Sequence, residues 1–204
     1  MSQTTVFLAS QSPRRAELLR QIGVQFRQQA VDLDETPGIG ELAADYVLRL
    51  AVEKAKAGWR WQFANDVDVP LMAMGSDTTV VLAGDILGKP ANREQGLAML
   101  QRLSGCTHQV MTAVALYYQD INKQQHCLSA LSVTDVEFRA VSDAELEAYW
   151  QTGEPIGKAG AYAIQGRGAI FIERIAGSYS GVVGLPLHET HQLLTAMEKI
   201  INHE

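Results

Sequence analysis

The order of strand-like and helix-like segments restricts the fold of this chain more than any other feature. Two long runs rich in β-branched and aromatic residues, 107–118 and 127–138, follow each other directly, with a polar turn around residues 120–122 between them. Elsewhere, shorter strand-like runs are separated by helical patterns. Because strands and helices mix without strict βαβ alternation, the sequence predicts an α/β fold with a twisted mixed β-sheet flanked by helices.

Shorter signals place the remaining elements. Further strands are expected at 5–9, 24–31, 71–82, 85–87 and 169–175, with 85–87 pairing as a hairpin with the strand before it. Helices are expected at 41–63, 93–103, 142–150 and 186–201, and one more begins at Pro13. Ser12 is a favourable N-cap for that first helix, and Gly23 ends it. Ser142 and Glu145 form a capping-box pattern.

Charge and cysteine usage limit the class of protein. The 204 residues include 17 Lys and Arg against 23 Asp and Glu, a formal net charge of −6. This balance disfavours nucleic-acid or membrane binding through bulk charge. Cys106 and Cys127 form no CxxC motif, and the N-terminus lacks the basic and apolar regions of a signal peptide. We therefore expect reduced thiols and a cytoplasmic location.

The strongest local signal is the sequence Ser-Gln-Ser-Pro-Arg-Arg at residues 10–15, where a strand passes into a helix. A helix N-terminus presents unsatisfied N–H donors and partial positive charge, which suit a phosphate. Arg14 and Arg15 can add charge-assisted hydrogen bonds. The alternative is a capped helix with two solvated arginines, but cations in a first helical turn are unfavourable without an anion nearby.

Two lysines and one aspartate are further candidates. Asp77 lies inside an apolar strand, so its carboxylate requires a cation, a metal or hydrogen-bond donors. Lys89, just beyond the hairpin, could supply that partner or contact a substrate. Lys54 continues the apolar row of the 41–63 helix. It either extends its ammonium group to the edge of the core, which is the more conservative interpretation, or reaches a phosphate.

Two loops carry weaker signals. The acidic stretch 32–38 contains Glu35, which could ligate a hard cation together with Asp77, although acidic loops are more often only solvated. The glycine-rich stretch 157–168 is not a P-loop, since the chain contains no GxxxxGK[ST]. Within it, Gln165 has the donor and the acceptor needed to recognise a pyrimidine edge, although most glutamines are only surface residues.

Taken together, these motifs resemble the Maf-like nucleotide pyrophosphatases. The matching segments are residues 8–19, 75–80, 88–90, 103–108, 158–166 and 184–186, in the family's order and over nearly the whole chain. The resemblance implies an elongated, two-lobed fold like that of inosine triphosphate pyrophosphatases, with residues 1–204 forming one domain around a central cleft. It also implies a divalent metal, Mg²⁺ or Mn²⁺, and hydrolysis of a nucleoside triphosphate to the monophosphate and pyrophosphate.

The resemblance also assigns roles to individual residues. Asp77 matches the catalytic acid/base position, and Glu35 falls in the family's acidic loop. The positions that match the phosphate end of the cleft are Ser10, Arg15, Lys54 and Lys89. The positions that mark the dTTP/UTP branch, as opposed to the 7-methyl-GTP branch, are Arg14, Thr78 and Gln165. Gly157 replaces an Asp that is common in the family, and Ala163 replaces a Gly.

One other class of function uses the same pocket. A non-enzymatic nucleotide-binding regulator, for example of cell division, would need the cations but no carboxylate able to activate water, so Asp77 and Glu35 favour the enzyme. A nucleic-acid-binding module is disfavoured by the acidic balance and the lack of a basic stripe. The expected partners are the nucleotide substrate and a second copy of the chain in a homodimer, with neither nucleic acid nor membrane.

Overall fold

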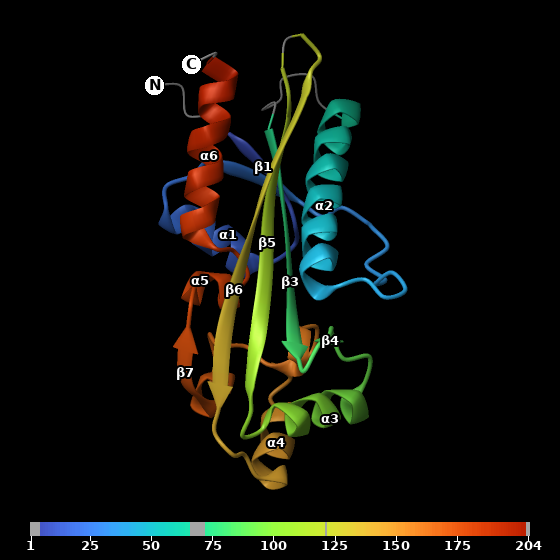
Figure 1. Cartoon of the computed structure of the whole chain (residues 1–204), viewed down its shortest axis with the longest axis vertical. Coiled ribbons are helices and arrows are strands. Elements are labelled where there is room, and N and C mark those ends of the chain that lie inside the picture. The colour runs from blue at the N-terminus through green and yellow to red at the C-terminus, as the bar shows by residue number, and fades with distance from the viewer. Residues whose placement is uncertain (1–4, 66–71, 121, 203–204) are drawn as a thin grey trace. The chain divides into compact units, whose positions relative to one another are not determined.

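The computed structural model describes residues 5–65, 72–120 and 122–202, and Figure 1 shows its helices and strands. The strands are β1 (Val6–Ala9), β2 (Phe26–Gln29), β3 (Met72–Leu82), β4 (Asp85–Leu87), β5 (Thr107–Gln119), β6 (Gln125–Phe138) and β7 (Ile172–Ala176). The α-helices are α1 (Pro13–Gln21), α2 (Ala43–Asn65), α3 (Arg93–Leu103), α4 (Asp143–Trp150), α5 (Tyr179–Val183) and α6 (Leu187–Asn202). Two 3₁₀ helices are η1 (Ala159–Ala161) and η2 (Arg167–Phe171).

The described strands form one mixed sheet. Its order is β2-β1-β3-β5-β6-β7, and β4 pairs with β3 beside this path. β1 runs parallel to both β2 and β3, whereas β3 with β4 and β6 with β7 are antiparallel pairs. The predicted α/β class with a mixed sheet is therefore confirmed, and so is the hairpin at residues 85–87.

The chain divides into two compact units. Unit 1 comprises residues 1–77, 112–132 and 184–204, and unit 2 comprises residues 78–111 and 133–183. Strands β3, β5 and β6 each contribute residues to both. The predicted organisation as one domain around a central cleft stays a prediction.

In unit 1, glycines let helix α2 lie close to the sheet. A Cβ atom at Gly58 of α2 would lie 2.8 Å from the Ala9 side chain, and one at Gly75 of β3 would lie 2.1 Å from the Ala51 carbonyl oxygen. Neither separation is compatible with a side chain, so both close approaches require glycine. Figure 1 shows α2 and α6 beside the strands of this unit. Phe7, Ala9 and Ala73 form a small buried cluster between β1 and β3.

Unit 2 has a continuous apolar core. Its buried residues come from β3, β4, α3, β5, β6, the loop after β6, α4 and the segment from η1 to η2: Val80, Leu87, Met99, Leu100, Leu103, Val110, Val136, Phe138, Val141, Leu146, Tyr149, Ala161, Tyr162 and Phe171. Helices α3 and α4 pack together, and Gly96 of α3 faces the Trp150 ring so closely that a Cβ atom there would lie 2.0 Å from it. This packing holds α4, and the turn that follows it, against the core.

The N-terminal ends of two helices were predicted correctly, but the boundaries of two strands differ from the prediction. Ser12 caps α1 by accepting from Arg15 N, Pro13 is its first residue, and the complete capping box forms at Ser142 and Glu145. The strand predicted at residues 24–31 is shorter in the structure, where it spans only Phe26–Gln29. The strand predicted from residue 169 is wrong at its start, because residues 169–171 belong to η2 and only Ile172–Ala176 is extended. Residue 71 of a predicted strand and residue 121 of the predicted turn lie outside the described residues.

Two further findings concern the cysteines and the helices. Cys106 and Cys127 are free thiols, as predicted. Among the described helices, none combines the length and the apolar character needed to cross a membrane.

Candidate active site

The centre of the site is built by the close approach of β3 to α2. Gly75 of β3 has no side chain, and a Cβ there would also lie 2.9 Å from Cβ of Lys54 and 2.5 Å from the Ala55 nitrogen. Two residues further along the same strand, Asp77 is therefore within reach of the Lys54 side chain. The strand direction and the glycine together place a buried carboxylate beside a buried ammonium group.

Lys54 lies between two carboxylates. Its Nζ is 2.7 Å from Asp77 Oδ1 and 2.5 Å from Glu35 Oε1. Lys54 and Asp77 are only 8% and 7% exposed, so both side chains are shielded from solvent. The interpretation of Lys54 as a lysine at the edge of the core is wrong, and the partner that buried Asp77 required is Lys54. A buried charge of either sign is tolerated only with such pairing.

The acidic loop that carries Glu35 is fixed to α2 at two points. Tyr46 Oη donates a hydrogen bond of 2.9 Å to the Glu35 carbonyl. Glu41 accepts from Arg49 through both oxygens, at 2.6 Å from Nε and 2.7 Å from Nη2, and Arg49 also donates to the Thr36 carbonyl. A bidentate pair of this kind restricts orientation as well as distance. The Glu35 carboxylate is thus presented by an anchored loop.

Ser10 and Arg15 form a second polar group at the junction of β1 and α1. Ser10 Oγ accepts from Arg15 Nη1 and from Ser12 N, both at 3.2 Å. Arg15 Nε donates to the Gly184 carbonyl at 2.8 Å, and the Ser76 hydroxyl donates to the same carbonyl at 3.1 Å. This carbonyl links α1 to β3 beside Asp77.

The backbone of this junction differs from the expectation of free donors. Ser12 N and Arg15 N, two of the groups predicted to bind a phosphate, already donate to the Ser10 and Ser12 hydroxyl oxygens. The two guanidiniums therefore provide the charge of this junction, and the serine hydroxyls organise its backbone.

Electrostatics couples the two groups of residues. Burial lowers the pKa of Arg15, the negative charges of Asp77 and Glu35 oppose that lowering, and the neighbouring Arg14 adds to it. Burial also raises the pKa of Tyr46 to about 12, and Asp77 and Glu35 add to that rise. Because the two carboxylates act on both residues, Arg15, Tyr46, Asp77 and Glu35 lie within one electrostatic neighbourhood.

This neighbourhood fits a divalent cation held with substrate oxygens. Glu35 and Asp77 both direct one carboxylate oxygen to a single cationic centre, the Lys54 ammonium group. In the part of the chain that the structure describes, no group of three or more His, Cys, Asp or Glu is arranged to hold a metal. Mg²⁺ is commonly bound by one or two carboxylates and completed by water and phosphate oxygens. The two carboxylates therefore fit that pattern and do not form an all-protein metal cage.

The remaining predicted residues belong to unit 2. Thr78 follows Asp77 on β3, Lys89 follows β4, and Gln165 is exposed in the segment between η1 and η2. Gly160 N donates to the Gly88 carbonyl at 3.1 Å, which joins the glycine-rich segment to the stretch next to Lys89. Ser10, Arg14, Arg15, Glu35, Lys54 and Asp77 all belong to unit 1.

Comparison with known proteins assigns the family. The model of the Maf-like protein family matches residues 5–197. The chain belongs to the Maf-like protein family. A Maf-like relative from Pseudoalteromonas atlantica, named dTTP/UTP pyrophosphatase, is 53% identical over 94% of this chain and 96% of its own length. Relatives of the same name from Alkalilimnicola ehrlichii and Shigella dysenteriae are 51% and 50% identical, over 95% and 94% of this chain and 93% and 92% of their own lengths.

The fold of this Maf-like chain also occurs among solved structures. A HAM1 protein from Coxiella burnetii aligns with a TM-score of 0.50 and 17% identity, covering 94% of this chain and 98% of that one. At this identity the likeness concerns the fold alone.

Several residues of this candidate site were not predicted individually. Tyr46 holds the Glu35 loop, and Ser76 and Gly184 link β3 to Arg15. Tyr46 could have been found, since it lies eight residues before Lys54 and therefore on the same face of α2. Nothing in local spacing connects Gly184 with Arg15, 169 positions earlier in the chain.

Proposed function

We propose that this chain hydrolyses nucleoside triphosphates, dTTP and UTP in preference to others, to the monophosphate and pyrophosphate. The observation that carries the proposal is the convergence of Glu35, Asp77, Lys54 and Arg15 in unit 1. Lys54 and Arg15 supply the positive charge that binding of a triphosphate requires. Asp77 and Glu35 supply the carboxylates that activation of water requires. The names of three relatives that are about half identical over nearly their whole length support the same activity.

In the proposed mechanism, the cations neutralise and orient the triphosphate. Arg15 and Arg14 offer bidentate donors to phosphate oxygens, whereas Lys54 and Lys89 offer compact point charges. Ser10 keeps Arg15 in place through the 3.2 Å hydrogen bond from Nη1. Positioning and charge stabilisation supply most of the acceleration in phosphoryl transfer.

Asp77 is the proposed general base. Its carboxylate would accept a proton from the water that attacks the α-phosphorus, and pyrophosphate is the leaving group. When the triphosphate is present, its oxygens compete for the Lys54 ammonium group, which releases Asp77 Oδ1 for this role. Glu35 and Asp77 are the residues that would hold Mg²⁺ or Mn²⁺. Such an ion would neutralise charge on the phosphate oxygens.

Base selection is assigned to Gln165, with Arg14 and Thr78. Uracil and thymine present an N3–H donor beside carbonyl acceptors, so one amide can accept from N3–H and donate to a carbonyl oxygen. Cytosine has neither the N3 proton nor the O4 acceptor. Such a mismatch in a dry site costs about 1–3 kcal/mol, or roughly 5- to 150-fold in kcat/KM.

The test is a product and substrate analysis of the full chain. Phosphorus NMR with dTTP, with and without Mg²⁺ or Mn²⁺, should show pyrophosphate and dTMP as the first products. A panel of dTTP, UTP, dCTP, ATP and 7-methyl-GTP should give the highest kcat/KM for the first two, and Gln165→Glu should reduce that preference. Orthophosphate and dTDP as initial products would refute the α–β cleavage, and a purine ranked first would refute the base assignment.

The second candidate is a nucleotide-binding regulator without turnover. It predicts saturable binding of dTTP with no pyrophosphate release under any metal condition. A cytoplasmic location and a homodimer stay predictions, which fractionation and light scattering can check.

A further inference from the structure

The segment that carries Gln165 is fixed by two side chains that the proposed chemistry does not use. Tyr149 is the penultimate residue of α4, and Glu154 follows in the turn after that helix. Tyr149 Oη donates to Glu154 Oε1 at 2.7 Å and accepts from Ala163 N at 3.2 Å. Glu154 Oε1 also accepts from Gly168 N at 3.0 Å, and Oε2 accepts from Arg167 N at 2.9 Å. We call Tyr149 and Glu154, with these hydrogen bonds, the 149/154 clasp.

The clasp holds the segment on both sides of Gln165. Ala163 lies two residues before Gln165, and Arg167 and Gly168 lie two and three residues after it. The backbone of residues 163–168 is therefore bound at its two ends, while Gln165 itself is exposed. The arrangement restricts the backbone of Gln165 and leaves its amide free to meet a ligand.

Two glycines make this approach possible. A Cβ atom at Gly166 would lie 2.3 Å from Glu154 Oε2. A Cβ atom at Gly168 would lie 2.6 Å from the Ala163 carbonyl oxygen and 2.7 Å from Tyr149 Oη. At Gly168 a side chain would overlap the Ala163 carbonyl and Tyr149 Oη, and at Gly166 it would displace the Glu154 carboxylate from its hydrogen bonds.

The clasp is itself anchored in unit 2. The Tyr149 ring is buried and packs edge-on against Phe171, with ring centroids 5.1 Å apart. Thr152 Oγ1 donates to the Tyr149 carbonyl at 2.7 Å and accepts from Glu154 N at 3.1 Å, which fixes the turn. Burial alone would raise the pKa of Glu154, but the hydrogen bonds from Gly168 N, Tyr149 Oη and Arg167 N lower it, with a smaller contribution from Lys158. The clasp therefore holds Glu154 as a carboxylate.

We infer that Tyr149 and Glu154 are positioning residues for substrate specificity, because they set the orientation in which Gln165 meets the pyrimidine base. This inference rests on the proposed function. Neither residue needs to touch the substrate. Their effect should pass through Gln165, so removing the clasp should lower discrimination between bases more than it lowers turnover.

The first experiment measures specificity. The substitutions are Tyr149→Phe, which keeps the ring packing, and Glu154→Gln, which keeps the size of the side chain. Each should lower the ratio of kcat/KM for dTTP to that for dCTP by about fivefold or more, in line with the loss of one specific hydrogen bond. With saturating dTTP, kcat should change less than that ratio. Glu147→Gln, an exchange of the same kind on α4, where Glu147 pairs with Arg93 of α3, is the matched control and should leave the ratio unchanged.

A double-mutant cycle tests whether the clasp affects base specificity through Gln165. In a Gln165→Ala background the ratio is already reduced, so adding Tyr149→Phe should reduce it little further. Fully additive losses, or an unchanged ratio in both clasp variants, would overturn the inference. A general loss of stability lowers the rates with both nucleotides and leaves their ratio in place.

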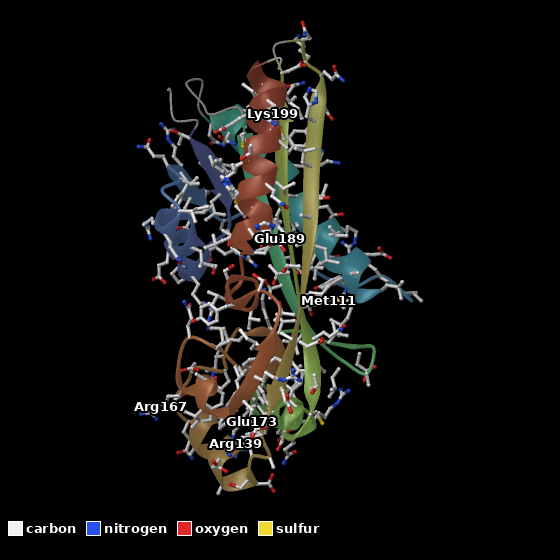
Figure 2. The ribbon with its side chains drawn as sticks, turned by 60° about the vertical axis from the view of Figure 1, so that its left-hand side comes forward. Met111, Arg139, Arg167, Glu173, Glu189 and Lys199 are labelled. Carbon is white, nitrogen blue, oxygen red and sulfur yellow. The ribbon has the colours of Figure 1, made fainter. Side chains whose placement is uncertain are left out.

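The second experiment does not depend on activity. In the nucleotide-free protein, the amides of Ala163, Arg167 and Gly168 should exchange with deuterium at least tenfold faster in Glu154→Gln or Tyr149→Phe than in wild type. Arg167→Ala is the control, because its side chain is exposed and points away from the ribbon in Figure 2 while its backbone N–H remains. A wild-type enzyme without pyrimidine preference would refute the proposed function. Unchanged exchange in the variants would refute the clasp.

Discussion

His108 of β5 should make the stability of the protein depend on pH. It is 2% exposed, and its Nε2 lies 2.8 Å from Tyr162 Oη. Burial lowers the pKa of His108 from 6.5 to about 4, and the backbone of Cys106 offsets only part of that effect. The imidazole is therefore neutral in the folded protein near pH 6, whereas it is largely protonated in the unfolded chain.

The magnitude follows from linkage. Because the folded-state pKa is lowered, the unfolded state binds more protons between pH 6.5 and about 4, and stability falls as pH falls through that window. At pH 5.5 the unfolded histidine is about 90% protonated and the folded one only a few per cent, which favours unfolding by about 1.3 kcal/mol relative to pH 7.5. The full loss, reached below pH 4, is about 3 kcal/mol.

The assay is urea unfolding at pH 7.5 and 5.5 for wild type and His108→Gln. The amide can still donate to Tyr162 Oη but does not titrate. Whatever its constant effect on stability, this variant should lose about 1.3 kcal/mol less than wild type between the two pH values, since the other titrating groups are common to both. His188→Gln, at an exposed position of α6, should retain the wild-type difference. Equal pH dependence in wild type and His108→Gln would refute the reasoning.

Three other substitutions test the site and its supports. Asp77→Asn should lower turnover by roughly 10²-fold or more while the chain still folds, because Glu35 remains to pair with Lys54; near-normal turnover in a folded variant would exclude an essential role for Asp77. Gly75→Ala should destabilise the fold by roughly 1–3 kcal/mol or more, since the added Cβ overlaps the α2 backbone, and thermal unfolding at or above the wild-type temperature would contradict that. Ser142→Ala removes the capping box and should cost about 1 kcal/mol in urea unfolding, with kcat unchanged as the check that the effect is structural.

Helix ends could be predicted from sequence because their causes are local. Ser12 and Pro13 begin α1, and Ser142 and Glu145 begin α4, through contacts that span three residues. In each case the side chain that satisfies the first free N–H groups is encoded next to them. Hairpin pairing of β4 with β3 is local in the same sense.

The role of Lys54 could not be predicted because it depends on two distant segments. Helical spacing shows only that Lys54 shares a face with Leu50 and Tyr46. Its charge is tolerated there because two carboxylates lie next to it. Gly75 lets β3, which carries Asp77, pack closely against α2, and the anchored loop places Glu35 beside Lys54. The family motifs named these residues, but the contact between them is a property of tertiary packing.

The error at residues 169–171 has a similar cause. An apolar run of this length suggests a strand, but Arg167 N and Gly168 N are bound by Glu154, and Ala169 N donates to the Gly166 carbonyl. The backbone there curls into η2 before it extends. The tertiary hydrogen bonds of the clasp override the local β propensity.

The Gly184 carbonyl has a consequence for the order in which the protein is made. Arg15 Nε and Ser76 Oγ share it as their acceptor, so both wait for a residue that the ribosome adds 169 and 108 positions after them. Residues 78–111 and 133–183 of unit 2 are synthesised before unit 1 receives its last segment. The nascent chain must therefore hold Arg15 without this acceptor until residue 184 emerges, and a stop codon upstream of residue 184 removes the acceptor that Arg15 and Ser76 share.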